Sequence, residues 1–427
     1  MKLESIRLIN YACFRDILVP FNSTFNIIAG INGSGKSSLL KATRDYLIFY
    51  SSGIVPELKN PRIEVQIHEG RYRFERQYPV SIEVQGKQNI NDTSFQSSIT
   101  KLNDIQIPSV EGEYKTLLYG QNVLNKDEIF PVFVYYDAVR SWIDTGKPIN
   151  EVQIMQEKSS RMDAYIDWKD AARGTDALKD WVIVQTMERL QTFVETGCSP
   201  NNTENVNDEL ALVNQAISMT IKEAKGLRYD IKQRSLLMEW NRSDGEVFTA
   251  LFDNLSDGER VMVALVADIA RRACILNPHL GEKVLQQTPG VVLIDELDLH
   301  LHPKWERQLP NGLKKAFPAM QFIATTHSPQ ILSELSPDEI ILISGETAEN
   351  PEASYGLNSD RILEDIMDAA SRPQKIKDSL SKLFLAIERN SLDEAREYLK
   401  ELSKEAPAIM EIATARALMK RKEILGR

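Results

Sequence analysis

The sequence predicts an α/β protein with a mixed sheet, in which an antiparallel β lobe stands beside a parallel α/β core. An apolar run over residues 24–29 leads into the glycine-rich stretch 30–37, and a helix-like run over 37–50 follows. Short strand-like runs separated by turn residues fill 62–86, which is typical of antiparallel strands. From residue 254 onward, helical and strand-like patterns alternate, as they do in a parallel α/β sheet.

Composition is typical of a soluble globular protein. The 427 residues allow about two or three domains. No apolar run approaches a membrane span, and the N-terminus opens with a strand-like pattern, so we expect no signal peptide and no membrane partner. Cys13, Cys198 and Cys274 lack metal-ligand spacing and predict reduced thiols in the cytoplasm. The net charge of −10 does not predict nucleic-acid binding by the whole chain.

Four segments with different patterns suggest the domain organisation. Residues 1–150 predict an N-terminal lobe with the glycine-rich loop and the antiparallel strands, within which 87–128 has the composition of polar loops. Residues 151–226 are polar with helical spacing and predict an inserted helical lobe. Residues 227–350 predict a second lobe that begins with hairpin strands, and 351–427 predict a helical tail.

The tail contains three predicted helices. The first places five apolar residues on one face: Ile376, Leu380, Leu383, Phe384 and Ile387. A capping box of Ser391 and Glu394 predicts the start of the second, and Pro407 precedes a third that ends in basic residues. Two compatible interpretations of the tail stay open: a small helical cap on the sheet, and a docking surface for another protein.

A complete G-x-x-x-x-G-K-S phosphate-binding loop begins at Gly30. Together with Gly33 and Gly35, this glycine allows the backbone to curl so that its N–H groups point at phosphate oxygens. The dipole of the following helix also favours an anion. We expect Lys36 to reach the β- and γ-phosphates and the Ser37 hydroxyl to hold Mg²⁺. The alternative is a chance match in a glycine-rich turn, which the flanking strand and helix disfavour.

Two carboxylates follow the apolar run 291–294, whose composition is that of a strand buried on both faces. Asp295 is placed to hold Mg²⁺ through water, and Glu296 to polarise the water that attacks a γ-phosphate. Two solvated acids at a strand end are the alternative, which the phosphate-binding loop elsewhere in the chain disfavours. A second apolar run, 131–136, predicts another buried strand.

Ser256, Gly258 and Glu259 precede the helical run 260–275. Ser256 and Glu259 have the spacing of an ordinary capping box. A serine hydroxyl, a glycine and the free amides of a helix N-terminus also make an anion site. Because both interpretations use the same physical features, both can hold at once.

Three histidines and an aspartate complete the set of candidate residues. His327 follows the strand-like run 321–324 and is expected to contact the γ-phosphate, with a purely structural histidine as the alternative. Asp298 is a candidate for contacts across a dimer interface. His300 and His302 lack a third ligand nearby and are weak evidence for a metal site.

With these motifs in this order, the chain resembles the RecF/SMC/Rad50-like branch of the ABC ATPases, which implies an ABC-type P-loop ATPase head. The segments 255–260, 264–272, 297–303 and 355–363 are also similar to a bacterial group described as predicted ATP-binding proteins involved in virulence. That group is similar to PtuA, the ATPase subunit of the Septu anti-phage systems. The resemblance covers 1–50 and 250–427 well and the middle loosely.

The resemblance implies roles for particular residues. Asp295 and Glu296 would serve hydrolysis, Ser256 and Gly258 would sense the nucleotide of another subunit, and His327 would report on the γ-phosphate. Asp257 replaces the glycine of transporter signatures but fits the RecF-like branch, and no clear Q-loop glutamine follows the run ending at residue 136. Asn10 and Arg15 match a segment that often lies near the nucleotide. The residues that would bind ATP and Mg²⁺ are Gly30, Asn32, Gly33, Ser34, Gly35, Lys36, Ser37 and Ser38.

The resemblance also implies partners. A homodimer or higher even oligomer is expected, in a two-component system with a separate nuclease, often of the HNH class, because the chain carries no nuclease motif of its own. Three functions compete: a sensor ATPase that regulates a partner nuclease in anti-phage defence, a RecF-like DNA-repair ATPase that binds DNA directly, and a transporter subunit. The RecF-like signature and the helical tail count against the transporter.

Overall fold

This computed structural model describes residues 1–51, 68–70, 73–75, 79–88, 93–102, 105–111, 127–138, 160–173, 175–196, 208–242, 245–370 and 372–425. The chain divides into two compact units, Met1–Ser359 and Asp360–Arg427, which are described separately below. Across these described ranges, no helix combines the length and the apolar character needed to cross a lipid bilayer.

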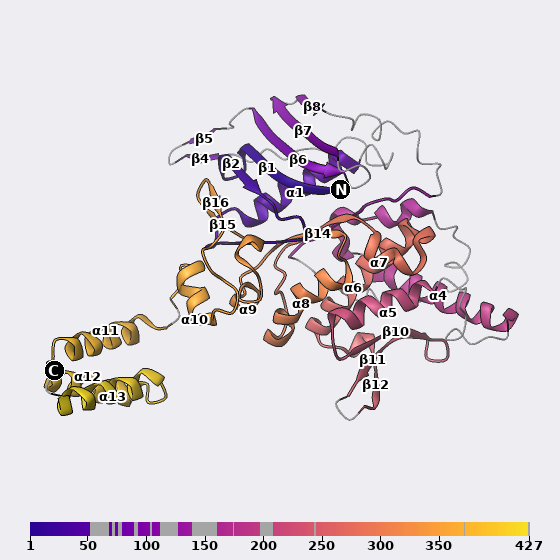
Figure 1. Cartoon of the computed structure of the whole chain (residues 1–427). Helices are drawn as coiled ribbons and strands as arrows, with labels where there is room; N and C mark the ends of the chain where they lie inside the picture. The colour runs from indigo at the N-terminus through magenta and orange to yellow at the C-terminus, as the bar shows by residue number, and fades with distance from the viewer. Residues whose placement is uncertain are drawn as a thin grey trace. The chain divides into compact units, whose positions relative to one another are not determined.

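A five-stranded antiparallel sheet occupies the N-terminal part of the first unit (Figure 1). Its strands follow the order β2 (Phe14–Pro20), β1 (Lys2–Tyr11), β6 (Val80–Gln88), β7 (Thr93–Leu102) and β8 (Ile105–Glu111). A bulge between Leu3 and Ser5 shifts the register of β1, so that Leu3 and then Ile6 and Leu8 are buried on its inner face. A separate hairpin joins β4 (His68–Gly70) and β5 (Arg73–Glu75).

The prediction of polar loops over 87–128 is wrong for the described residues 87–88, 93–102 and 105–111. Strands β7 and β8 lie there, and β6 continues to Gln88. The error has a physical cause. Phe95 and Ile99 are buried on one face of β7, but the position between them is Ser97, which is also buried and hydrogen-bonds the Tyr46 hydroxyl. Because a polar serine occupies an inner position, β7 lacks the regular alternation of apolar and polar residues that predicts a strand.

The six-stranded sheet forms the centre of the first unit. Its order is β16 (Thr347–Glu349), β15 (Ile340–Ser344), β3 (Phe25–Ala29), β14 (Met320–Thr325), β13 (Gly290–Ile294) and β9 (Val132–Tyr136). All pairs are parallel except β15 with β16. Every residue of β3, β14, β13 and β9 is buried, as expected for strands covered on both faces. The predicted buried strands over 131–136 and 291–294 are confirmed.

Helices cover both faces of this sheet. Helix α1 (Lys36–Ser51) contacts β13 and β14 as well as β1 and β6, so it lies between the two sheets. Helix α6 (Asp257–Leu276) contacts β9. Adjacent residues of β9 show the two faces, because the Tyr135 ring lies under Arg44 of α1 while the Tyr136 hydroxyl donates to Asp268 of α6 at 2.9 Å. The predicted alternation of helix and strand from residue 254 is therefore confirmed.

A three-stranded antiparallel sheet precedes α6. It consists of β10 (Ala224–Asp230), β11 (Ser235–Asn241) and β12 (Val247–Leu251), in that order. Within 151–226 the described residues form short 3-10 turns over 161–165 and 168–173 and two helices, α4 (Thr175–Thr196) and α5 (Glu209–Thr220). Helix α5 packs on α6, α8 and β10. The remaining helices of this unit are α7 (Val284–Gln287), α8 (Pro303–Ala316) and α9 (Pro329–Leu332), and α10 (Ser359–Arg361) lies at the boundary between the units.

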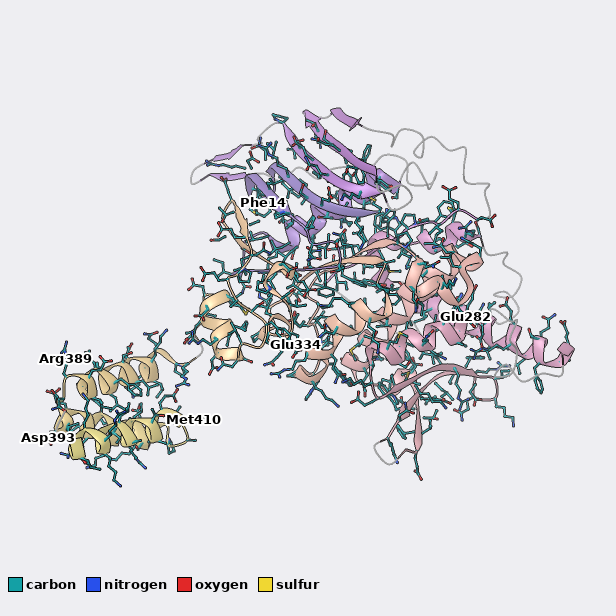
Figure 2. The ribbon with its side chains drawn as sticks, in the orientation of Figure 1. Phe14, Glu282, Glu334, Arg389, Asp393 and Met410 are labelled. Atoms are coloured by element: carbon teal, nitrogen blue, oxygen red, sulfur yellow. The ribbon has the colours of Figure 1, made fainter. Side chains whose placement is uncertain are left out.

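The second unit has its own core, which is built by its last three helices. Helices α11 (Gln374–Glu388), α12 (Leu392–Glu405) and α13 (Met410–Leu425) surround a cluster of buried side chains: Leu383, Ala386, Ile387, Ala395, Leu402, Ile412, Ala415 and Met419. The predicted apolar face of the first helix packs into this cluster, and charged residues such as Arg389 and Asp393 lie on the outside (Figure 2). Ser391 precedes α12 as predicted, but its side chain makes no capping hydrogen bond, so the predicted capping box is wrong.

Candidate functional site

The candidate site lies where the central strands end. Because β3, β14 and β13 are parallel neighbours, their carboxyl ends meet at one edge of the sheet. The loop 30–35 leaves this edge after β3, Asp295 and Glu296 follow β13, and Thr325 ends β14. Open α/β sheets bind ligands at this edge. The topology thus brings together three segments that are about 30 to 260 residues apart in the chain.

Glycines give the phosphate-binding loop its shape. Gly30, Gly33 and Gly35 have φ angles of 147°, 82° and 96°, in the region that side chains disfavour. A Cβ atom on Gly35 would lie 2.3 Å from Cζ of Phe14, and one on Gly30 would lie 2.7 Å from the carbonyl oxygen of Ile343. Neighbouring strands therefore approach the loop so closely that only glycine fits at these two positions.

Lys36 folds back over the loop. Its Nζ atom donates to the carbonyl oxygens of Gly30 and Ile31, each at 2.9 Å, and the residue is buried. Burial lowers the pKa of Lys36 from its ordinary value, while the carboxylates of Asp295 and Glu296 oppose that shift. The hydroxyl of Ser34 is also buried, without a hydrogen-bond partner in the described part of the chain. A cation and an unpaired hydroxyl in a glycine-rich loop that leads into a helix N-terminus suit an anionic ligand.

Asp295 is the centre of the site. Its carboxylate is buried, and its Oδ1 atom lies 3.1 Å from Oγ of Ser37 and 2.5 Å from Oγ1 of Thr325, both of which donate to it. The backbone N–H of Asp295 donates to the carbonyl oxygen of Tyr136 at 2.9 Å, which fixes the start of the segment. A serine hydroxyl beside a buried carboxylate is an oxygen donor set of the kind that Mg²⁺ prefers, so these residues fit the ion.

Glu296 is held in an unusual backbone conformation. Its φ angle is 51°, in the left-handed region that non-glycine residues rarely adopt. The N–H of Glu296 donates to Oγ1 of Thr325 at 2.7 Å, so one hydroxyl fixes both carboxylate residues. Such strain is found at functional sites when the surrounding structure enforces it. The Glu296 side chain is half-buried beside the loop residues.

The predicted capping box at Ser256 is confirmed. Ser256 precedes α6, its N–H and hydroxyl both donate to Oε2 of Glu259, and its Oγ accepts from the Glu259 N–H. Gly258 is buried in the first turn, and a Cβ atom there would lie 2.3 Å from the carbonyl oxygen of His300. The start of α6 is therefore packed directly against the segment that follows Glu296. The anion-binding role of this turn stays a prediction.

Asp298 anchors the end of β14 within the same chain. Its Oδ1 accepts from Oγ1 of Thr326 at 2.6 Å and from the backbone N–H of His327 at 3.1 Å. The His327 side chain is exposed at the edge of the site, so it is available to a ligand. His302 caps α8 by accepting from the Lys304 N–H at 3.2 Å. In the described parts of the chain, no group of three potential ligands is arranged to hold a metal ion.

The hairpin between β1 and β2 lies beside the loop. Phe14 and Cys13 are the residues that would meet a Cβ atom on Gly35. Figure 2 labels Phe14 in this part of the molecule. Arg15, the predicted residue next in sequence, is exposed on β2. Asn10 donates through Nδ2 to the carbonyl oxygen of Pro79 at 2.9 Å, and its place near the nucleotide stays a prediction.

Sequence reasoning missed two contributions. It gave no role to Thr325, although the parallel register that pairs Ile294 with Ala324 places Thr325 beside Asp295. It also missed the approach of Phe14 to the loop, which requires the fold of the first hairpin to be known. The role of Thr325 could have been predicted from the sequence. Thr325 is a hydroxyl residue at the end of a predicted strand, and such a residue can reach a carboxylate at the end of a neighbouring parallel strand.

The chain is similar to several known proteins. The retron Vc95 probable ATPase of Vibrio cholerae serotype O1 biovar El Tor is 28% identical over 81% of this chain and 74% of its own length. The Septu protein PtuA of Bacillus thuringiensis is 31% identical over 29% of this chain and 33% of its own. The SMC head domain from Thermotoga maritima aligns over 82% of this chain and 98% of its own, with 15% identity and a TM-score of 0.43.

The RecF/RecN/SMC N-terminal domain family matches residues 2–349 of the chain. This match spans both predicted ATPase lobes and every candidate site residue. The predicted α/β fold class, with a mixed sheet, and the resemblance to the RecF/SMC branch and to Septu PtuA are confirmed. The chain belongs to the RecF/RecN/SMC N-terminal domain family.

Proposed function

We propose that this chain is an ABC-type ATPase that dimerises around ATP and regulates a separate partner nuclease in anti-phage defence. The observation that carries the nucleotide chemistry is the junction of Ser37, Asp295 and Thr325 at the mouth of the phosphate-binding loop. The reaction is ATP and water to ADP and phosphate. Phosphoryl transfer relies almost wholly on positioning and charge stabilisation, which this junction and the loop provide.

In this proposal the phosphate-binding loop and the helix that follows it bind the nucleotide. Backbone amides over 30–38 and the N-terminus of α1 hold the phosphates, and Nζ of Lys36 exchanges its two carbonyl partners for phosphate oxygens. The Ser34 hydroxyl gains the hydrogen-bond partner that it lacks. Ser37 and Asp295 hold Mg²⁺, which supplies positive charge to the β- and γ-phosphates when it is bound.

Glu296 acts as the base in this proposal. It accepts a proton from the attacking water while its backbone stays fixed by Thr325. His327, exposed at the same edge, contacts the γ-phosphate. The Ser256 hydroxyl and the amides near Gly258 complete the pocket of a second copy of the chain, which makes the site depend on dimerisation.

Similarity to two groups of relatives supports a role with a partner. The chain aligns with a retron probable ATPase over most of its length and with Septu protein PtuA over a shorter segment. In the two-component systems that the Septu resemblance implies, the ATPase acts on a separate nuclease, often of the HNH class. We therefore place the chain in the cytoplasm as the sensor subunit of such a pair. Co-purification with the product of the neighbouring gene, with and without ATP, tests this role, and a neighbour without nuclease or toxin character contradicts it.

Direct DNA binding in the manner of RecF is the second candidate, because the matching family includes RecF. It predicts that affinity for DNA falls steeply as salt is raised, since phosphate contacts release counterions. Titration of duplex and gapped DNA at two salt concentrations separates the candidates. Tight, salt-dependent binding by the chain without its partner favours the RecF-like function.

Glu296→Gln tests the base assignment. We expect hydrolysis to fall by at least about 100-fold while ATP stays bound and the dimer accumulates, because a general base contributes on the order of 10² to 10⁴ in rate. Lys36→Ala is expected to lose nucleotide binding instead. Phosphate release, bound-nucleotide analysis and light scattering separate the two effects, with the exposed Glu346→Gln as the control. Hydrolysis by Glu296→Gln at the wild-type rate contradicts the assignment.

A further inference from the structure

Strand β12 is an open, apolar sheet edge. It pairs with β11 on one side, and among the described residues no strand pairs with its other side. Four of its five residues are exposed, and the exposed fractions of Val247, Phe248 and Leu251 are 47%, 45% and 36%. Natural proteins protect such edges with charges, prolines or short length because an exposed apolar edge pairs with other chains. The strand Val-Phe-Thr-Ala-Leu has no charge and no proline.

The backbone pattern shows which groups of β12 are available. In an antiparallel pair, successive residues direct their N–H and C=O groups to opposite sides. The carbonyl oxygen of Glu246 accepts from the Arg242 N–H at 2.8 Å, so this residue faces β11. The N–H and C=O groups of Phe248 and Ala250, at every second position after Glu246, therefore also face β11. The groups of the intervening residues face the open side. The groups on the open side are those of Val247, Thr249 and Leu251.

We infer that β12 is a self-association site that pairs antiparallel with β12 of a second copy, around a two-fold axis at Thr249. In this register Thr249 faces Thr249 of the other copy, and Val247 faces Leu251. Every one of the open N–H and C=O groups then finds a partner, because all three residues direct both groups to the same side. A two-fold interface needs a patch that is complementary to itself, and this strand has that property.

The side chains agree with this register. On one face, a Thr–Thr pair is flanked by two Val–Leu pairs, and on the other face the large Phe248 lies opposite the small Ala250. No like charges meet. Beside the edge lies a groove of about 520 Å³, lined by Trp240, Phe248, Thr249, Ala250, Leu251, Asn254, Leu255 and Glu259. The groove gives the side chains of the second strand apolar surface to bury.

A second copy is a better match for this edge than an unrelated peptide. A foreign strand that carried one charge would leave it facing apolar residues, whereas the identical strand brings none. The pairing uses no nucleotide, so it goes beyond the ATP-dependent dimer proposed above and does not rest on it. Two different two-fold interfaces in one chain give assemblies larger than a dimer.

Cysteine cross-linking tests the register. In Thr249→Cys the two thiol-bearing residues face each other, with Cα atoms about 5.5 Å apart, within the range that a disulfide spans. In Val247→Cys the two cysteines of the pair of copies are offset by four residues, about 13 Å along the strand, although Val247 and Thr249 are both exposed on β12. We expect a covalent dimer after mild oxidation from Thr249→Cys alone, with the wild-type chain as control for native cysteines. Equal cross-linking of both variants, or none from Thr249→Cys, overturns the inference.

Thr249→Pro provides the second test. Its N–H faces the open side, so proline removes no hydrogen bond to β11 and the chain keeps its fold, as circular dichroism checks. We expect the dissociation constant of nucleotide-free self-association to rise by at least about tenfold, because the central pair loses its hydrogen bonds. Sedimentation is run without nucleotide, in the wild type and in Lys36→Ala. An unchanged constant in a folded Thr249→Pro overturns the inference, whereas loss of ATP-dependent dimers in Glu296→Gln counts only against the proposed function.

Discussion

At the scale of single residues, one hydroxyl organises the candidate site. Thr325 Oγ1 donates to Asp295 and accepts from the N–H of Glu296, so it connects the residue proposed to hold Mg²⁺ with the residue proposed as base. Asp295 is buried and Glu296 has a left-handed backbone. A small displacement of either residue would therefore disturb the geometry of the site. The geometry of the site is therefore shared between three residues at the ends of two adjacent strands.

Thr325→Val tests this hub. The substitution keeps the shape, but the Glu296 N–H loses the Thr325 hydroxyl and Oδ1 of Asp295 keeps only the Ser37 hydroxyl of its two donors. We expect this loss to cost about 1–3 kcal/mol of unfolding free energy. We expect hydrolysis to fall more than nucleotide binding, because the backbone of Glu296 loses its anchor. Urea unfolding and steady-state phosphate release measure both effects. Thr325→Ser restores the hydroxyl and serves as the matched control, and full activity in Thr325→Val contradicts the hub.

The residues also show what sequence alone predicts. The phosphate-binding loop and the Asp295–Glu296 pair were recognisable because local spacing and flanking patterns define them. The contact of Phe14 with Gly35 was not, because it joins two elements through the fold of the first hairpin. Strand β7 was missed for a similar reason, since the buried Ser97 is explained only by Tyr46 on α1.

At the scale of elements, α6 connects the turn over 256–259 to the sheet. Its first turn touches the segment after Glu296 through Gly258 and His300. About three turns further on, Asp268 is buried between Arg271 and Arg272 and accepts from the Tyr136 hydroxyl of β9. One helix is thus fixed to the segment after Glu296 at one point and to the central sheet at another.

Gly258→Ala tests the first contact. Alanine is the better helix former, but its Cβ would lie 2.3 Å from the carbonyl oxygen of His300. Because that neighbour is backbone, we expect a net loss of about 1–3 kcal/mol in unfolding free energy and a displaced segment after Glu296. Thermal and urea unfolding measure the loss, and Asp257→Ala, at an exposed position of the same turn, is the control. A more stable Gly258→Ala refutes the close packing.

Asp268→Asn tests the second contact through pH. Burial tends to raise the pKa of Asp268, but Arg272 and Arg271 outweigh it and lower the pKa to about 2. A lowered pKa means that the stabilisation is complete above the unfolded value of about 3.9 and is lost as pH falls toward about 2. We expect Asp268→Asn to cost about 3–5 kcal/mol at pH 7, because two buried guanidinium groups lose their charge partner. The difference from wild type, followed by urea unfolding, shrinks below about pH 4.

At the scale of the whole molecule, the chain combines two units with separate cores. The matching family covers residues 2–349, which lie in the first unit. The second unit contains three helices around Leu383 and its neighbours. Its existence as three helices was predictable from periodicity, whereas the missing cap at Ser391 was not, because a capping hydrogen bond depends on backbone angles that the motif does not set.

Leu383→Ala tests the separate core. Leu383 is fully buried in the second unit, so its truncation is expected to cost that unit about 2–5 kcal/mol. The first unit has its own core, so its stability and its nucleotide binding are expected to stay unchanged. Hydrogen exchange measured along the chain separates the units, and Leu385→Ala, which is 45% exposed on the same helix, is the control. Parallel loss of protection in both units contradicts the separation.

The left-handed backbone at Glu296 has a consequence for protein engineering. Glycine and asparagine occupy that conformation more comfortably than glutamate. A library selected only for heat resistance will therefore enrich both replacements at this position. The selected variants will be more stable but will lack the proposed base, so such a selection needs a parallel screen for released phosphate.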